Sequence, residues 1–205
     1  MKRETLVKLL PVLLIGFVFA GAAFAQERRA SATKLKIRKL NGLGTRSLVD
    51  TPVFRNNASQ GTKRGAKWHQ VSVVYDTAPE WIDELTVEFH VLAVTDDPKT
   101  RKKVFTLYKL LVKYSDVAQG RGHVATAFLR PTAVTRYGNP IAVATIFSIG
   151  GKVVGEESQT TENLPQKWWS SQRVLDRVTV RKGYLLNRSQ SPWALVDYDA
   201  YEVIK

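Results

Sequence analysis

Two alternating segments joined by a short polar link constrain this chain more than any other feature. In residues 84–94 the odd positions are apolar and the even positions mostly polar, and residues 103–114 alternate in the same way. A period of two places the apolar side chains on one face of a β-strand. The link Asp96-Asp97-Pro98-Lys99 is rich in turn-forming residues. The pattern predicts a long β-hairpin with one buried face and indicates no catalytic chemistry.

Further strand-like segments lie on both sides of this hairpin. They cover residues 33–40, 68–75, 123–129, 141–149, 152–155, 174–181, 183–186 and 193–204. Turn residues separate them, and Gly150-Gly151 is the clearest turn because glycine adopts positive φ freely. Many short strands at such intervals are typical of a β-sandwich. We therefore predict an all-β sandwich, in which residues 141–149 lie across from or beside the first hairpin strand.

Two segments depart from the strand pattern. Residues 162–172 are predicted to form the only helix of the domain, because Asn163 can cap it and Pro165 suits a first turn. Residues 41–65 are polar and are predicted to form a long surface loop, with Val53-Phe54 as the one apolar exception and room for one short strand. The expected fold is thus all-β with one short helix.

The first residues have the pattern of an export signal. A basic start precedes an apolar run over residues 9–24 that ends in Ala23-Phe24-Ala25, which predicts a signal peptide cleaved before Gln26. A membrane anchor is disfavoured, because spanning needs about 20 apolar residues. We expect residues 1–25 to be the signal peptide, 26–32 a short polar segment and 33–205 the sandwich. The mature chain would lack a transmembrane anchor and lie in the periplasm, on the outer membrane surface or outside the cell.

The charge of the chain suggests a class of partners. The formal net charge is +13, and removal of the signal leaves about +11. Such a balance favours contact with an acidic surface, glycan or protein. Nucleic acid is not expected as a partner, because no recognition-helix, RNP or KH pattern accompanies the charge.

No pattern of catalytic or metal-binding residues is present. The chain has no cysteine and neither a G-x-S-x-G nor an S-x-x-K motif. The three histidines, His69, His90 and His123, are expected on polar strand faces at the surface, without metal-ligand spacing. Acidic pairs stand mostly beside turns, where carboxylates are commonly solvated. We expect no catalytic residue, no cofactor and no metal site, and hence no enzyme.

Two groups of residues are candidates for an interaction surface. The first is basic and lies at the hairpin tip: Lys99, Arg101, Lys102 and Lys103. The second is the pair Trp168-Trp169, which cannot both point inward from one short helix. The competing interpretation is that the lysines protect a strand edge from aggregation and that the indoles belong to the core.

The signal, the basic sandwich without cysteine, Trp168-Trp169 and the closing residues 191–195 and 201–205 together resemble the verrucomicrobial pilus-like proteins encoded beside type IV pilus-type machinery. The resemblance implies an immunoglobulin-like fold related to archaeal pilin domains. It also implies a non-catalytic structural or interaction role in the cell envelope, with other envelope or pilus-system proteins as partners. The alternative function is a secreted binding module for an acidic glycan or other polyanion.

One feature departs from type IV pilins, which keep an apolar N-terminal helix and polymerise through it. Here the apolar run over residues 9–24 would be removed with the signal. Polymerisation through such a helix is therefore disfavoured. Donation of the strand at residues 34–40 to a neighbour remains open.

Overall fold

The predicted hairpin is present and forms the longest strand pair of the structure. The computed structural model describes residues 35–52, 65–197 and 201–205. Strands β4 (Ile82–Asp96) and β5 (Lys103–Val117) pair antiparallel in continuous register along almost their whole length. The predicted signal, the 26–32 segment and Val53-Phe54 lie outside the described residues.

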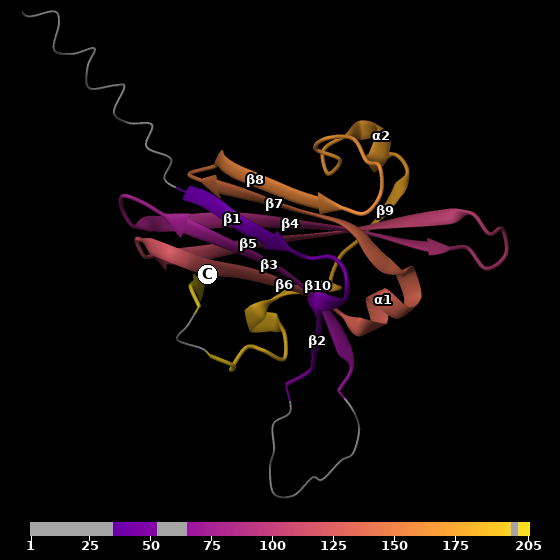
Figure 1. The fold of residues 1–205 in the computed structure, drawn as a ribbon, viewed down its shortest axis with the longest axis horizontal. Coiled ribbons are helices and arrows are strands. Elements are labelled where there is room, and N and C mark those ends of the chain that lie inside the picture. The colour runs from indigo at the N-terminus through magenta and orange to yellow at the C-terminus, as the bar shows by residue number, and fades with distance from the viewer. Residues whose placement is uncertain (1–34, 53–64, 198–200) are drawn as a thin grey trace, which may run out of the picture. The chain divides into compact units, whose positions relative to one another are not determined.

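The hairpin is the centre of the larger of two sheets, shown in Figure 1. Its strand order is β11-β5-β4-β7-β8, and β9 pairs in parallel with β5. The added strands are β7 (Asn139–Ile149), β8 (Lys152–Thr160), β9 (Val178–Arg181) and β11 (Val203–Ile204). The turn between β7 and β8 places Gly150 and Gly151 at φ 56° and 76°, as the glycine pair predicts.

The smaller sheet has the order β1-β3-β6-β10, and β2 pairs with β3 beyond the end of β1. Its strands are β1 (Leu35–Asn41), β2 (Leu48–Asp50), β3 (Lys67–Thr77), β6 (Gly120–Leu129) and β10 (Leu185–Asn187). Single 3₁₀ turns, η2 (Thr45–Ser47) and η3 (Arg188–Gln190), precede β2 and follow β10. The strands at 33–40, 68–75 and 123–129 are thus confirmed with small shifts in their ends.

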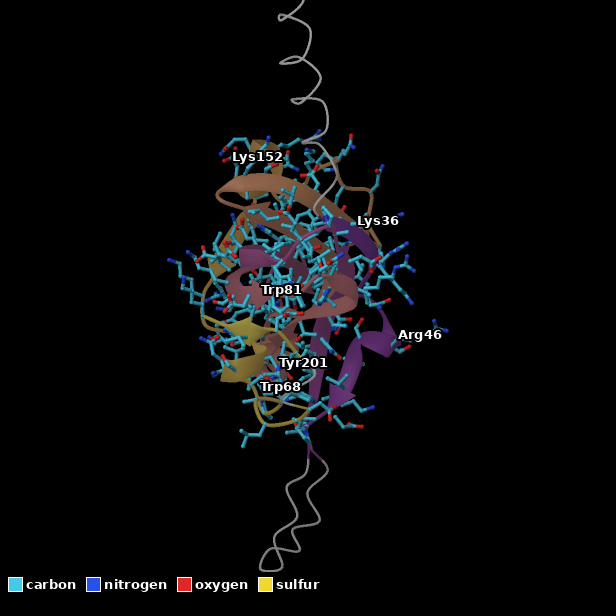
Figure 2. All side chains as sticks on the ribbon, turned by 90° about the vertical axis from the view of Figure 1, so that its left-hand side faces the viewer. Lys36, Arg46, Trp68, Trp81, Lys152 and Tyr201 are labelled. Atoms are coloured by element: carbon cyan, nitrogen blue, oxygen red, sulfur yellow. The ribbon has the colours of Figure 1, made fainter. Side chains whose placement is uncertain are left out.

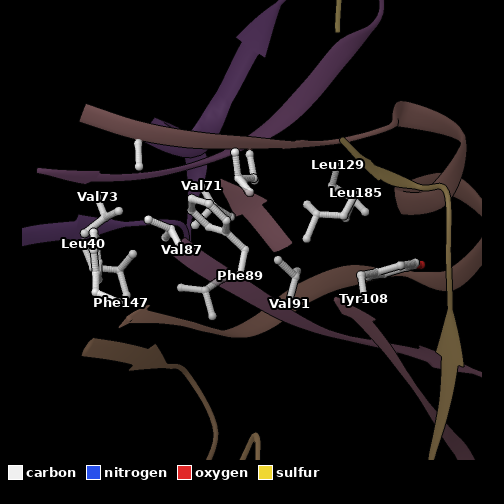
Figure 3. Close-up of a cluster of buried hydrophobic side chains, with 14 of the residues drawn as sticks. Leu40, Val71, Val73, Val87, Phe89, Val91, Tyr108, Leu129, Phe147 and Leu185 are labelled. Atoms are coloured by element: carbon white, nitrogen blue, oxygen red, sulfur yellow. The ribbon is translucent and has the colours of Figure 1, made fainter. Parts of the chain in front are cut away.

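The main core lies between the two sheets, and Figure 3 shows it in close-up. The odd positions of β4 from 85 to 93, among them Val87, Phe89 and Val91, are fully buried there in one cluster with Val71 and Val73 of β3. Burial of each such side chain contributes roughly 1.5–3 kcal/mol relative to exposure. The two sheets are therefore held together by the alternation that the sequence displays, and the all-β sandwich is confirmed.

The helix predicted at residues 162–172 is wrong in position. The longest described helix is α1 (Pro131–Tyr137), where Pro131 occupies the first turn and Ala133 and Tyr137 are buried on one face. Proline there both ends β6 and begins α1, because its fixed φ suits a first helical turn. Residues 162–171 form turns instead, and Lys167 has φ 56°, which a continuous helix does not allow.

The strand predicted over residues 174–181 is half wrong. Its first part belongs to one helical turn around α2 (Gln172–Leu175), and only Val178–Arg181 is extended. In the described residues no helix has the length and apolar character needed to cross a membrane.

Gly138, which follows α1, offers a test of this packing. An added Cβ would lie 1.7 Å from the Val94 carbonyl oxygen, and the backbone is at φ 87°, ψ −179°. Gly44 has nearly the same backbone, φ 80°, ψ −173°, with no atom within 4 Å of an added Cβ. Each alanine substitution should cost about 1–3 kcal/mol of backbone strain. Gly138→Ala should cost more than Gly44→Ala in urea unfolding, and equal costs would contradict the close approach to Val94.

Candidate interaction surfaces

The basic residues at the hairpin tip lie together and are exposed. Asp97 organises this tip, because its Oδ1 accepts a hydrogen bond from the Lys99 amide at 2.8 Å and its carbonyl accepts one from the Arg101 amide at 2.8 Å. The bond from Lys99 is the main reason that the pKa of Asp97 lies below its usual range. The carboxylate is thus used inside the turn, and the side chains of Lys99, Arg101, Lys102 and Lys103 are left in solvent.

Trp168 and Trp169 do not form one exposed pair. Trp168 is only 2% exposed and packs on the outer face of the larger sheet among Leu92, Leu107 and Ala142. Trp169 is half-buried and meets Trp168 edge to face at 5.8 Å. Trp168 is therefore a core residue and does not present its ring to a partner. Trp169 lies at the boundary between core and surface, in line with the expectation that the two indoles cannot both point inward.

The chain from residue 161 to 178 covers part of the outer face of the larger sheet. This covering segment contacts the hairpin near its tip, where Lys103 Nζ lies 3.4 Å from Glu162 Oε1. A cavity of about 430 Å³ opens between the segment and the hairpin, lined by Leu92, Phe105, Asn163, Leu164, Pro165, Arg173, Val174, Arg177 and Val178. The sequence prediction missed this cavity, because it assigned residues 174–177 to a strand. The adjacent pairs Arg173-Val174 and Arg177-Val178, four residues apart, were the available signal.

Strand β5 has an interrupted outer edge. Strand β9 pairs with residues 105–108 and β11 with residues 114–115, so among the described residues 109–112 pair with β4 alone. Three exposed apolar side chains follow this edge: Val180 (49%), Leu111 (56%) and Val203 (64%). By register Val180 and Val203 lie beside Leu107 and Ser115, which share the outer face of β5 with Leu111. The result is an apolar row along an open strand edge, which we call the β5 edge.

The tryptophans form no row of exposed rings. Trp193 stacks on Phe128 with centroids 4.3 Å apart and meets Trp68 edge to face at 5.6 Å. Trp81 is 64% exposed and is labelled in Figure 2 apart from Trp68. Figure 2 also shows Lys36, Arg46 and Lys152 on separate parts of the ribbon. Positive charge is therefore spread over the surface as well as concentrated at the hairpin tip.

The expectation of surface histidines is wrong. His69 and His90 are 4% and 3% exposed, and the side chain of His123 is 12% exposed. His90 Nε2 lies 2.9 Å from Glu88 Oε1, and this contact is the main reason that the pKa of Glu88 is lowered. Each histidine has a different partner, and among the described residues no three histidine or carboxylate side chains are grouped as metal ligands.

His123 lies between the Thr77 hydroxyl and the Glu202 carboxylate, and these three groups have the composition of a catalytic triad. Its Nδ1 lies 2.5 Å from Glu202 Oε1 and its Nε2 lies 3.1 Å from Thr77 Oγ1. Thr77, however, is 2% exposed, and its hydroxyl donates to the Ala118 carbonyl at 2.6 Å. The hydroxyl proton is thus committed and no substrate can reach Oγ1. The arrangement ties the chain end to β3 and β6.

Both the sequence and the fold of this chain are similar to those of known proteins. A protein-family model matches residues 25–205. The structure is similar to a crystal structure of a protein from Akkermansia muciniphila, with a TM-score of 0.66 and 22% identity, over 84% of this chain and 93% of that chain. At this identity the likeness shows a shared fold. A search of curated proteins finds no match.

His69 should make stability depend on pH. Its Nε2 lies 2.6 Å from the Gly42 carbonyl, and burial lowers its pKa below 6.5. The unfolded chain therefore binds a proton more readily than the folded chain, so the free energy of unfolding should fall as the pH drops below about 6.5. His69→Gln keeps a donor for Gly42 but cannot titrate. Urea unfolding at pH 7, 6 and 5 should show a smaller decrease in the free energy of unfolding for the variant than for the native protein. An equal decrease in both would exclude His69 as its cause.

Proposed function

The chain belongs to the protein family whose model spans residues 25–205, and on that premise we propose that it is a non-catalytic structural or interaction protein of the cell envelope. More specifically, we assign it to a type IV pilus-like system, exported to the periplasm, the outer membrane surface or the exterior. The resemblance to verrucomicrobial pilus-like proteins supports this assignment, since the Akkermansia protein of similar fold comes from a verrucomicrobe. We include in this proposal the immunoglobulin-like fold that the resemblance implies, and we assign the domain a role in contacts with other proteins.

The observation that carries the proposal is the β5 edge. The carbonyl of Lys113 accepts the Lys205 amide at 2.9 Å, so the main-chain groups of Lys113 point outward from β4. Because main-chain direction alternates along a strand, those of Leu111 and Lys109 point the same way. Leu111 there offers its amide and carbonyl to an incoming extended segment, and Lys109 offers its carbonyl, because the parallel pairing of Tyr108 with Arg181 already uses the Lys109 amide. The apolar row offers the segment side-chain contacts.

Addition of a strand is a known way to join proteins through main-chain hydrogen bonds. In this structure β1 already pairs with β3 over residues 35–41, so its donation to a neighbour would require it to leave its own sheet. We therefore assign the β5 edge the acceptor role. A segment from another envelope protein is the proposed donor, and the exposed Lys109 favours an acidic one.

The basic hairpin tip is proposed as a second contact, which brings an acidic partner to the protein. The four cations lie where two long strands meet, and in Figure 1 the end of this β4–β5 hairpin extends beyond α2. Charges at such a position increase the rate of encounter more than they increase affinity. The alternative function, binding of an acidic glycan, would use the same cations, but it has less support because no row of exposed indoles accompanies them.

Leu111→Glu tests the acceptor role of the β5 edge. A carboxylate in the apolar row should prevent docking of a partner strand. Because the site is exposed, the free energy of unfolding should change by less than about 0.5 kcal/mol. Val153→Glu is the matched control, because Val153 is 54% exposed on β8 at the other edge of the sheet. Crosslinking in native cells should lose partners with Leu111→Glu and keep them with Val153→Glu. Identical partner sets for the two variants would exclude the β5 edge.

A double substitution, Lys102→Glu with Lys103→Glu, tests the hairpin tip. Reversal of both charges should slow association with the partners identified by crosslinking, and the difference from the native protein should shrink at high salt because ions screen exposed charges. Surface plasmon resonance at two salt concentrations measures this. A matched reversal of Lys36 and Lys39 on β1 should have little effect. Unchanged association of the tip variant at both salt concentrations would remove the docking role.

A further inference from the structure

The cavity beside the hairpin tip has the size and lining of a ligand site. Its volume of about 430 Å³ falls within the range of small-molecule pockets, roughly 300–1,000 Å³. Six of its nine lining residues are apolar: Leu92, Phe105, Leu164, Pro165, Val174 and Val178. They come from β4, β5, the covering segment and the start of β9, so the walls are built by chain segments distant in sequence.

The polar lining is dominated by two cations. Arg173 lies in α2, and Arg177 follows two residues after the end of α2, where its amide bonds to the Val174 carbonyl at 2.9 Å. Both arginines line the cavity together with Val174 and Val178. Both arginines are exposed, and among the described residues neither has a carboxylate within 4.0 Å.

We propose that this cavity binds a single amphiphile with an unbranched hydrocarbon tail and a carboxylate head, that is, a free fatty acid. The apolar walls remove the tail from water. The paired guanidinium groups match a carboxylate, because the planar donor fork of arginine forms two parallel hydrogen bonds with it. The exposed lysines of the hairpin tip add positive potential beside the cavity and favour the same sign of ligand.

An extended peptide fits this cavity less well. Each peptide unit brings an amide and a carbonyl that need hydrogen-bond partners when buried. The cavity wall offers Asn163 as its single neutral polar side chain. A hydrocarbon tail needs no such partners, so a fatty acid satisfies the lining and a peptide does not. This site is separate from the β5 edge, and the failure of either proposal leaves the other standing.

The test is titration of the full mature protein with sodium dodecanoate, kept below its micelle concentration, in a calorimeter. Dodecanoate should bind with one site per chain. The double variant Arg173→Glu with Arg177→Glu should weaken this binding by about tenfold or more, because two charge-assisted contacts are lost and two repulsive ones added. The matched control, Arg46→Glu with Lys152→Glu, makes the same charge change at exposed sites away from the cavity and should leave binding within about twofold.

Three comparison ligands make the test specific. Acetate lacks the tail, dodecyltrimethylammonium carries the opposite charge, and a short peptide with a C-terminal leucine carries the same carboxylate on a polar chain. All three should bind at least about tenfold more weakly than dodecanoate. Sedimentation with phosphatidylglycerol vesicles distinguishes binding to an anionic membrane surface from binding of a single amphiphile in the cavity.

Several results would overturn the proposal. These are no binding of dodecanoate by the native protein, equal binding by the two double variants, or tighter binding of the peptide or the cation. Binding to vesicles without binding of monomeric dodecanoate would also overturn it. Thermal unfolding of each variant shows that it is folded, and a cavity-filling change, Val174→Trp, provides a second line of evidence because it should weaken dodecanoate without altering charge.

Discussion

The antiparallel ladder between β4 and β5 is the constraint on which the rest of the structure depends. Register from Ile82 with Val117 to Asp96 with Lys103 fixes which side chains face the smaller sheet and which face outward. A slip of one residue would exchange the two faces and expose Phe89 and its neighbours. Strand β7 pairs on the other side of β4, so the same register sets the position of the next strand as well. Both the core and the outer surface follow from this one pairing.

The outer face of the larger sheet is divided between two uses. At one end the covering segment buries Trp168 against Leu92 and Leu107, and the cavity lies where this cover does not fill the space. At the other end the outward-facing side chains of β5 alternate between charged and apolar, as in Lys109, Leu111 and Lys113, and all three are exposed. The short strands β9 and β11 each protect part of β5, and the gap between them leaves the β5 edge. An open edge can pair with another chain, and this is the edge to which we assign the acceptor role.

Much of the fold was predictable because period-two alternation reports directly on sheet faces. The hairpin, the neighbouring strand at residues 141–149 and the glycine turn after it are confirmed for this reason. The helix prediction at residues 162–172 is wrong, and the longest described helix, α1, begins instead at Pro131 just after β6, because proline suits a first helical turn. The histidines were assigned to the surface, yet His69 and His90 are buried. Alternation shows that a face is polar, but whether another part of the chain covers that face depends on distant segments.

The sequence by itself determined the two-sheet class, the buried row of β4 and the basic character of the hairpin tip, because each of these depends on residues close together in the chain. Only the tertiary structure decided that Trp168 belongs to the core, that two short strands leave a gap along β5 and that Arg173 and Arg177 border an apolar cavity. These features arise where segments 50 or more residues apart meet, as with Lys103 and Glu162. Contacts of that kind depend on how the chain returns to the sheet, which no local pattern encodes.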